Sequence, residues 1–114
     1  MDRIDRIDDV RDLIYKIISE YAKLPYRYGE IRNYTIVDQE RNHFILMNEG
    51  WSGKKRIHGM VVHVEIRDRK IWIHYDGIED GITDELVANG VPKDCIVLAF
   101  HPPYIREHTG YAIA

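Results

Sequence analysis

The stretch Val62–Tyr75, which reads VHVEIRDRKIWIHY, decides the fold of this 114-residue chain. Apolar and polar residues alternate before the dipeptide Asp68-Arg69 and again after it. A period of two is typical of strands with one half-buried face, and a short polar dipeptide between two such strands indicates a tight turn. We therefore predict an antiparallel hairpin of the strands Arg56–Arg67 and Ile71–Tyr75.

Earlier segments extend this hairpin into a meander. Ile31–Asp38 and His43–Asn48 are strand-like, and the polar residues 39–42 between them predict a turn. Residues 50–54, GWSGK, are expected to form the next turn. Four strands in sequence joined by short turns imply an antiparallel sheet. A short buried strand at Cys95–Phe100 would bring the sheet to about four to five strands.

Two helices complete the predicted fold. Apolar residues recur at spacings of three and four over Arg3–Leu24, which indicates an amphipathic helix, and Pro25 is expected to end it. A second, short helix is predicted over Asp80–Asn89. Asp80 or Thr83 is expected to cap its N-terminus, and Gly90 is expected to end it in the left-handed conformation. The pattern predicts a single α+β domain over residues 1–114, with both helices packed on one face of the sheet.

Composition limits the classes of function. The apolar fraction of 45% and the charged fraction of 31% are ordinary for a globular protein, and the net charge of −3 disfavours free-standing binding to duplex DNA. Cys95 lies in an apolar run, so we expect a buried, reduced thiol. The N-terminus is charged from Asp2 onward, and no apolar run approaches membrane length, so we predict a cytoplasmic protein without a signal peptide.

No complete set of catalytic or metal-binding groups is apparent. His63 and His74 fall on neighbouring predicted strands and could lie nearly opposite one another, with Asp76 close by. A zinc site needs three or four converging ligands, and no motif supplies them at a defined spacing. We therefore predict sheet-surface histidines, no metal, no cofactor and no catalytic residue. A small metal-dependent enzyme is the least favoured alternative.

Basic residues form two clusters, Lys54-Lys55-Arg56 and the group of Arg67, Arg69 and Lys70. Consecutive turns of a meander lie at opposite ends of the sheet. The two clusters should therefore be far apart and should not merge into one DNA-binding stripe. Solvated turns are the favoured interpretation of both.

The C-terminal tail after Pro102 is expected to be irregular and leaves two interpretations open. Its prolines stiffen the chain, and tyrosine and arginine are common at interface hot spots. Either the tail wraps its own domain, with Tyr111 and Ile113 filling the core, or it binds a partner protein. The partner-binding candidates are His101, Pro102, Pro103, Tyr104, Arg106 and Tyr111.

Several segments together resemble the XisI family, whose members are called fdxN element excision controlling factors in nitrogen-fixing cyanobacteria. The resemblance is contiguous from about residue 5 to residue 114. The segments that carry it are Glu20–Tyr26, Gly50–Gly53, Arg56–Gly59, Ile71–Gly77, Gly90–Cys95, Phe100–Tyr104, Arg106, Thr109–Tyr111 and Ala114.

This resemblance implies a role in the programmed excision of a DNA element, a site-specific recombination linked to heterocyst differentiation. It implies a non-enzymatic accessory that acts through an XisH-like partner, while a separate recombinase cuts and rejoins DNA. The alternative is a direct DNA-binding excision factor that uses Lys54, Lys55 and Arg56. A homodimer or higher homo-oligomer is compatible with either, because the half-exposed sheet around Trp72 offers a surface.

Overall fold

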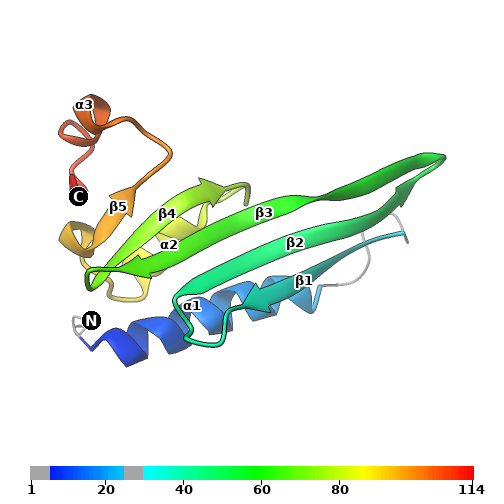
Figure 1. The fold of residues 1–114 in the computed structure, drawn as a ribbon, viewed down its shortest axis with the longest axis horizontal. Coiled ribbons are helices and arrows are strands. Elements are labelled where there is room, and N and C mark those ends of the chain that lie inside the picture. The colour runs from blue at the N-terminus through cyan, green and yellow to red at the C-terminus, as the bar shows by residue number, and fades with distance from the viewer. Residues whose placement is uncertain (1–5, 25–29) are drawn as a thin grey trace.

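The computed structural model describes residues 6–24 and 30–114, which form a five-stranded sheet with helices packed on it (Figure 1). The strand order is β1-β2-β3-β4-β5, so each strand lies beside its neighbour in sequence. The elements are α1 (Ile7–Ala22), β1 (Ile31–Val37), β2 (His43–Ser52), β3 (Lys55–Arg67), β4 (Lys70–Asp76), α2 (Ile82–Ala88), a 3₁₀ turn (Lys93–Cys95), β5 (Ile96–Leu98) and α3 (Pro103–Arg106).

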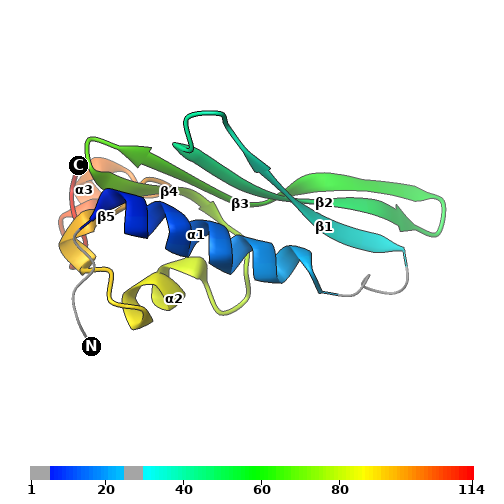
Figure 2. The same ribbon diagram turned by 90° about the horizontal axis from the view of Figure 1, so that it is seen from below.

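The predicted α+β class is confirmed. The first four strands form the antiparallel meander that alternation predicts, and β5 is added parallel to β4. A parallel neighbour needs a crossover connection, which α2 and the 3₁₀ turn provide. Figure 2 shows α1 and α2 across the same face of the sheet; we call the opposite side, where Arg106 of the tail lies beside Trp72, the open face.

The core lies between the two helices and the sheet. Val10, Ile14, Ile17 and Ile18 are the buried residues of α1. They belong to one apolar cluster with alternate residues of the strands, namely Phe44, Leu46, Val62, Val64, Ile66, Ile71 and Ile73. The helix ends at Ala22, earlier than the predicted Leu24, which lies beyond the last turn and is 54% exposed. Pro25, the predicted stop, lies outside the described residues.

The hairpin of β2 and β3 is longer than predicted. β2 continues to Ser52, and the turn comprises only Gly53 and Lys54, so Gly50 and Trp51 are strand residues rather than turn residues. Gly50 has φ +154°, and a Cβ atom there would lie 1.9 Å from the Glu30 carbonyl oxygen. Only glycine allows this close approach, so a residue typical of turns serves here inside a strand.

The longer hairpin projects beyond the helices as an arm, which comprises residues 47–60; β1 accompanies it only as far as Gly50 (Figure 1). β4 pairs with β3 only as far as Val62, so among the described residues no strand lies on the other side of β3 along the arm. Its projection agrees with the elongated dimensions of 43 × 30 × 27 Å.

The second helix is shorter than predicted and is capped from a distance. It spans Ile82–Ala88, and neither Asp80 nor Thr83 is its N-cap residue, because Gly81 occupies that position. The Asp76 carboxylate, at the end of β4, accepts hydrogen bonds from the backbone N–H groups of Ile82 at 3.0 Å and Thr83 at 3.4 Å. The Asp76 carboxylate thus satisfies backbone N–H groups of the first turn, which is the role of a side-chain N-cap.

The helix end agrees with expectation, but the segment that follows differs from it. Gly90 adopts φ +99°, as expected for the left-handed stop. Ile96–Leu98 is the only strand within the predicted Cys95–Phe100, because Cys95 belongs to the 3₁₀ turn and Phe100 lies in a turn. Cys95 is therefore half-buried rather than buried. Within the otherwise irregular tail, Pro102 and Pro103 start the short helix α3.

Candidate functional site

The C-terminal tail is anchored to the domain by Arg106. Its guanidinium donates hydrogen bonds to the carbonyl oxygens of His101 at 2.8 Å, Ala99 at 3.3 Å and Ile113 at 3.4 Å. The same group lies 5.6 Å from the ring centroid of Trp72 on the open face. The fork of Arg106 is thus engaged within the chain and organises the tail.

Tyr111 and Ala112 bring the tail against β5. Ala112 pairs with Val97 in a parallel bridge and donates its N–H to the Ile96 carbonyl oxygen at 2.9 Å. Tyr111 is half-buried against the core, and Lys93 Nζ lies 5.4 Å from its ring centroid. Burial raises the pKa of the Tyr111 hydroxyl. This half of the tail wraps its own domain, although Ile113, which was also expected to fill the core, is 52% exposed.

The rest of the tail displays non-polar side chains to solvent. Tyr104 is 69% exposed and Phe100 47% exposed, with the ring of the half-buried His101 against Phe100 at 4.6 Å. We call the exposed group the tail patch; it consists of Phe100, Pro102, Pro103, Tyr104 and Ile113. An exposed apolar group on a framework held by Arg106 needs little ordering before it binds a partner.

The open face carries a histidine cluster that the sequence predicts only in part. The rings of His63 and His74 lie 4.8 Å apart, which confirms that these residues are neighbours. A third histidine, His43, places Nδ1 3.1 Å from Nε2 of His63. Glu65 Oε1 lies 2.8 Å from His74 Nε2 and from Arg67 Nη2.

The electrostatics of this cluster follow from its crowding. Burial, with the adjacent His74 and His43, lowers the pKa of His63. Hydrogen bonding from Arg67, and then from His74, lowers the pKa of Glu65. Among residues 6–24 and 30–114, no group of three or more histidine, cysteine, aspartate or glutamate side chains is arranged to hold a metal ion. The predicted third member, Asp76, is engaged at the start of α2.

The two basic clusters lie at opposite ends of β3, as predicted (Figure 1). In the arm, Arg56 pairs with Glu49 at 3.0 Å and lies 5.5 Å from the ring of Trp51. At the other end, Arg67 is paired with Glu65. Arg67 is balanced by Glu65, but Glu49 is shared by Arg56 and Arg32, whose guanidinium lies 2.6 Å away, so one positive charge remains on the arm in addition to those of Lys54 and Lys55.

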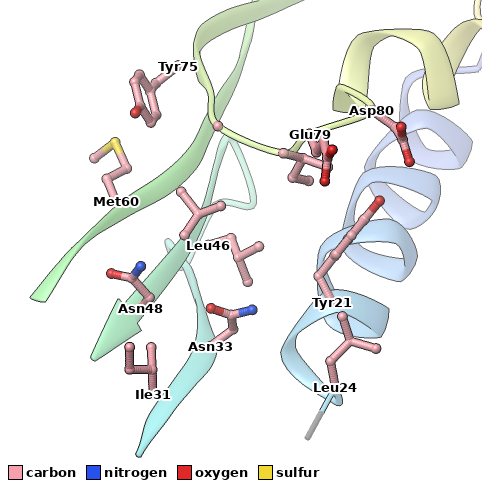
Figure 3. A pocket seen from close by; sticks show the side chains of 13 residues that line it. Tyr21, Leu24, Ile31, Asn33, Leu46, Asn48, Met60, Tyr75, Glu79 and Asp80 are labelled. Atoms are coloured by element: carbon pink, nitrogen blue, oxygen red, sulfur yellow. The ribbon is translucent and has the colours of Figure 1, made fainter. Parts of the chain in front are cut away.

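A cleft of about 660 Å³ lies between the end of α1, the arm and the loop that precedes α2 (Figure 3). Its polar lining includes Asn33, Asn48, Glu79, Asp80 and Tyr21. Tyr21 donates its hydroxyl hydrogen to Glu85 at 3.4 Å, and burial together with Glu85 raises its pKa.

Within the part of the chain that the structure describes, no helix is both long and apolar enough to span a membrane.

Comparisons with known proteins agree on one family. The family model described as XisI protein matches residues 1–113. The crystal structure of a XisI-like protein from Anabaena variabilis ATCC 29413 superimposes with a TM-score of 0.86 at 36% identity, and the match covers 96% of this chain and all of that one. Curated proteins give no match.

A second crystal structure, of the fdxN element excision controlling factor XisI from the same organism, has a TM-score of 0.76 at 33% identity. That match covers 95% of this chain and 98% of the other. The agreement extends over the helices, the sheet and the tail, and it is not limited to one motif. The chain therefore belongs to the XisI protein family.

Proposed function

We propose that this chain is a non-enzymatic accessory factor that controls the programmed excision of a DNA element by binding an XisH-like protein. Its family membership and the description of its structural neighbour as an excision controlling factor support the role in excision. The observation that carries the mode of action is the tail patch. Phe100 and Tyr104 stay exposed although Arg106 holds the tail around them in place.

The histidine cluster does not favour an enzymatic role. Its groups are paired with one another, with Glu65 bonded to both His74 and Arg67. We assign the cluster to the open face of the sheet and the recognition of a partner to the tail.

The first test is co-expression with an XisH-like protein, followed by light scattering with and without a duplex from the end of the element. We expect a binary complex that depends on the tail patch. The double variant Phe100→Ala/Tyr104→Ala should weaken it by at least about tenfold, since buried aromatic anchors dominate interfaces. Tyr15→Ala, which removes a 47% exposed aromatic from α1, is the matched control and should bind as wild type does.

Failure of the wild-type pair to associate would end this proposal. The alternative, direct DNA binding, is favoured by one observation: Lys54 and Lys55 at the arm tip are exposed and pair with no carboxylate in the described residues. It predicts a duplex shift by this chain alone that weakens steeply with salt and is lost in Lys54→Glu/Lys55→Glu.

A further inference from the structure

One edge of β3 is unpaired along the arm. β4 pairs with β3 from Arg67 to Val62, and the hydrogen bond from the Gly77 N–H to the Val61 carbonyl oxygen, at 2.7 Å, lies where this pairing ends. Residues 55–60 have β2 on one side and no described strand on the other. This edge extends for about 20 Å and contains no proline. Such an edge is a template for pairing with another strand.

Two exposed non-polar side chains lie at one end of this edge. Met60 is 42% exposed, and Tyr75 at the end of β4 is 49% exposed. Figure 3 shows Met60 and Tyr75 beside one another at the rim of the cleft. Methionine and aromatic residues are enriched in the centres of protein interfaces.

The two ends of the edge carry opposite charge. The arm tip has Lys54 and Lys55, whereas Glu79 and Asp80 line the cleft together with Met60 at the other end. All four side chains are exposed, and none forms an ion pair within the described residues. Arg56, between the ends, shares the Glu49 carboxylate with Arg32 and is therefore only partly neutralised.

We propose that two copies of this chain pair antiparallel along the 55–60 edge of β3, about a two-fold axis. An antiparallel two-fold pair brings the basic tip of each copy to the acidic loop of the other, so every charge contact occurs twice. A second copy supplies both halves of this charge pattern, because each chain carries the basic tip and the acidic loop. The two sheets would join across the arms, and Met60 and Tyr75 would be shielded at the joint.

The experiment is a charge swap monitored by light scattering and sedimentation at several protein concentrations. Wild type should have twice the 13.5 kDa mass of one copy. Lys54→Glu/Lys55→Glu and Glu79→Lys/Asp80→Lys should each weaken the dimer by at least about 100-fold, because like charges then meet at both ends. An equimolar mixture of the two variants should restore a dimer, since each tip again meets a loop of opposite charge. Arg69→Glu/Lys70→Glu, at the far end of β3, is the matched control and should remain dimeric.

Three results would overturn the proposal. The first is a wild-type protein that is monomeric at all concentrations. The second is a dimer whose dissociation constant does not change in Lys54→Glu/Lys55→Glu. The third is loss of the dimer in both variants without recovery on mixing, with circular dichroism showing both to be folded. Because no partner protein or DNA is present, these outcomes are independent of whether an XisH-like protein binds.

Discussion

Replacing Arg106 by Met should release the C-terminal tail while leaving the rest of the domain folded. Methionine keeps the aliphatic packing and removes the guanidinium, together with its three hydrogen bonds to carbonyl oxygens and its position over Trp72. Hydrogen bonds to charged groups contribute about 1.5–3 kcal/mol each, and exposed cation–π contacts about 0.5–1 kcal/mol. Only the bond to His101 is short, and Arg106 is half-buried. We therefore expect the free energy that holds the tail against the domain to fall by about 2–3 kcal/mol.

Hydrogen exchange of the Ala112 N–H measures this loss directly. That amide bonds to the Ile96 carbonyl oxygen only while the tail is docked. A change of 2–3 kcal/mol corresponds to exchange faster by about 30- to 150-fold, with core amides of β2 and β3 much less affected. Arg106→Lys is the matched control, because it keeps the charge without the fork and should recover only part of the protection. Ala112 protection within threefold of wild type in the methionine variant would refute the anchoring role of Arg106.

Three further predictions concern the rest of the domain. Asp76→Ala should lower the free energy of unfolding by about 1–2 kcal/mol in urea titrations, because it removes the cap of α2; an unchanged midpoint would contradict this. Gly50→Ala should destabilise by more than about 2 kcal/mol, because its Cβ atom would meet the Glu30 carbonyl, and Gly53→Ala, where no atom lies within 4 Å, should cost less. Folding lowers the pKa of His63, so the folded protein favours the neutral imidazole. The contribution of His63 to the free energy of unfolding is therefore fully present above its unfolded pKa of about 6.5, and it is lost as the pH falls through the lower folded pKa. His63→Gln should therefore flatten the decline in unfolding free energy from pH 7.5 to 5.5, and His108→Gln in the exposed tail should not.

Local chemistry accounts for what could be read from the chain. The alternation in Val62–Tyr75 and the spacing of apolar residues in α1 describe which side chains share a face, and they require no knowledge of distant contacts. The class, the meander and the placement of the two basic clusters follow from them. The family resemblance followed from segments spread along the chain, and the comparisons confirm it.

The partial view of the histidine cluster has a specific cause. His43 lies opposite Glu65, but this register includes a shift between Leu46 and Met47 where β3 holds one extra residue. A second shift, between His63 and Val64, leaves His74 without a direct partner on β3. Counting back from the arm tip without the first bulge places Val64 opposite His43 and so hides the contact of His43 with His63, and nothing in the alternation marks where that bulge lies.

The first helix, the four strands of the meander with their order, and the family could be read from the sequence alone, because these depend on periodicity and on residues close in the chain. Tertiary structure decided how individual polar groups are used. Asp76 became the cap of a helix six residues away, and Arg106, a candidate for partner binding, became the anchor of its own tail. Each outcome depends on which backbone donors or acceptors folding leaves unpaired nearby, and that is settled only when the elements pack together.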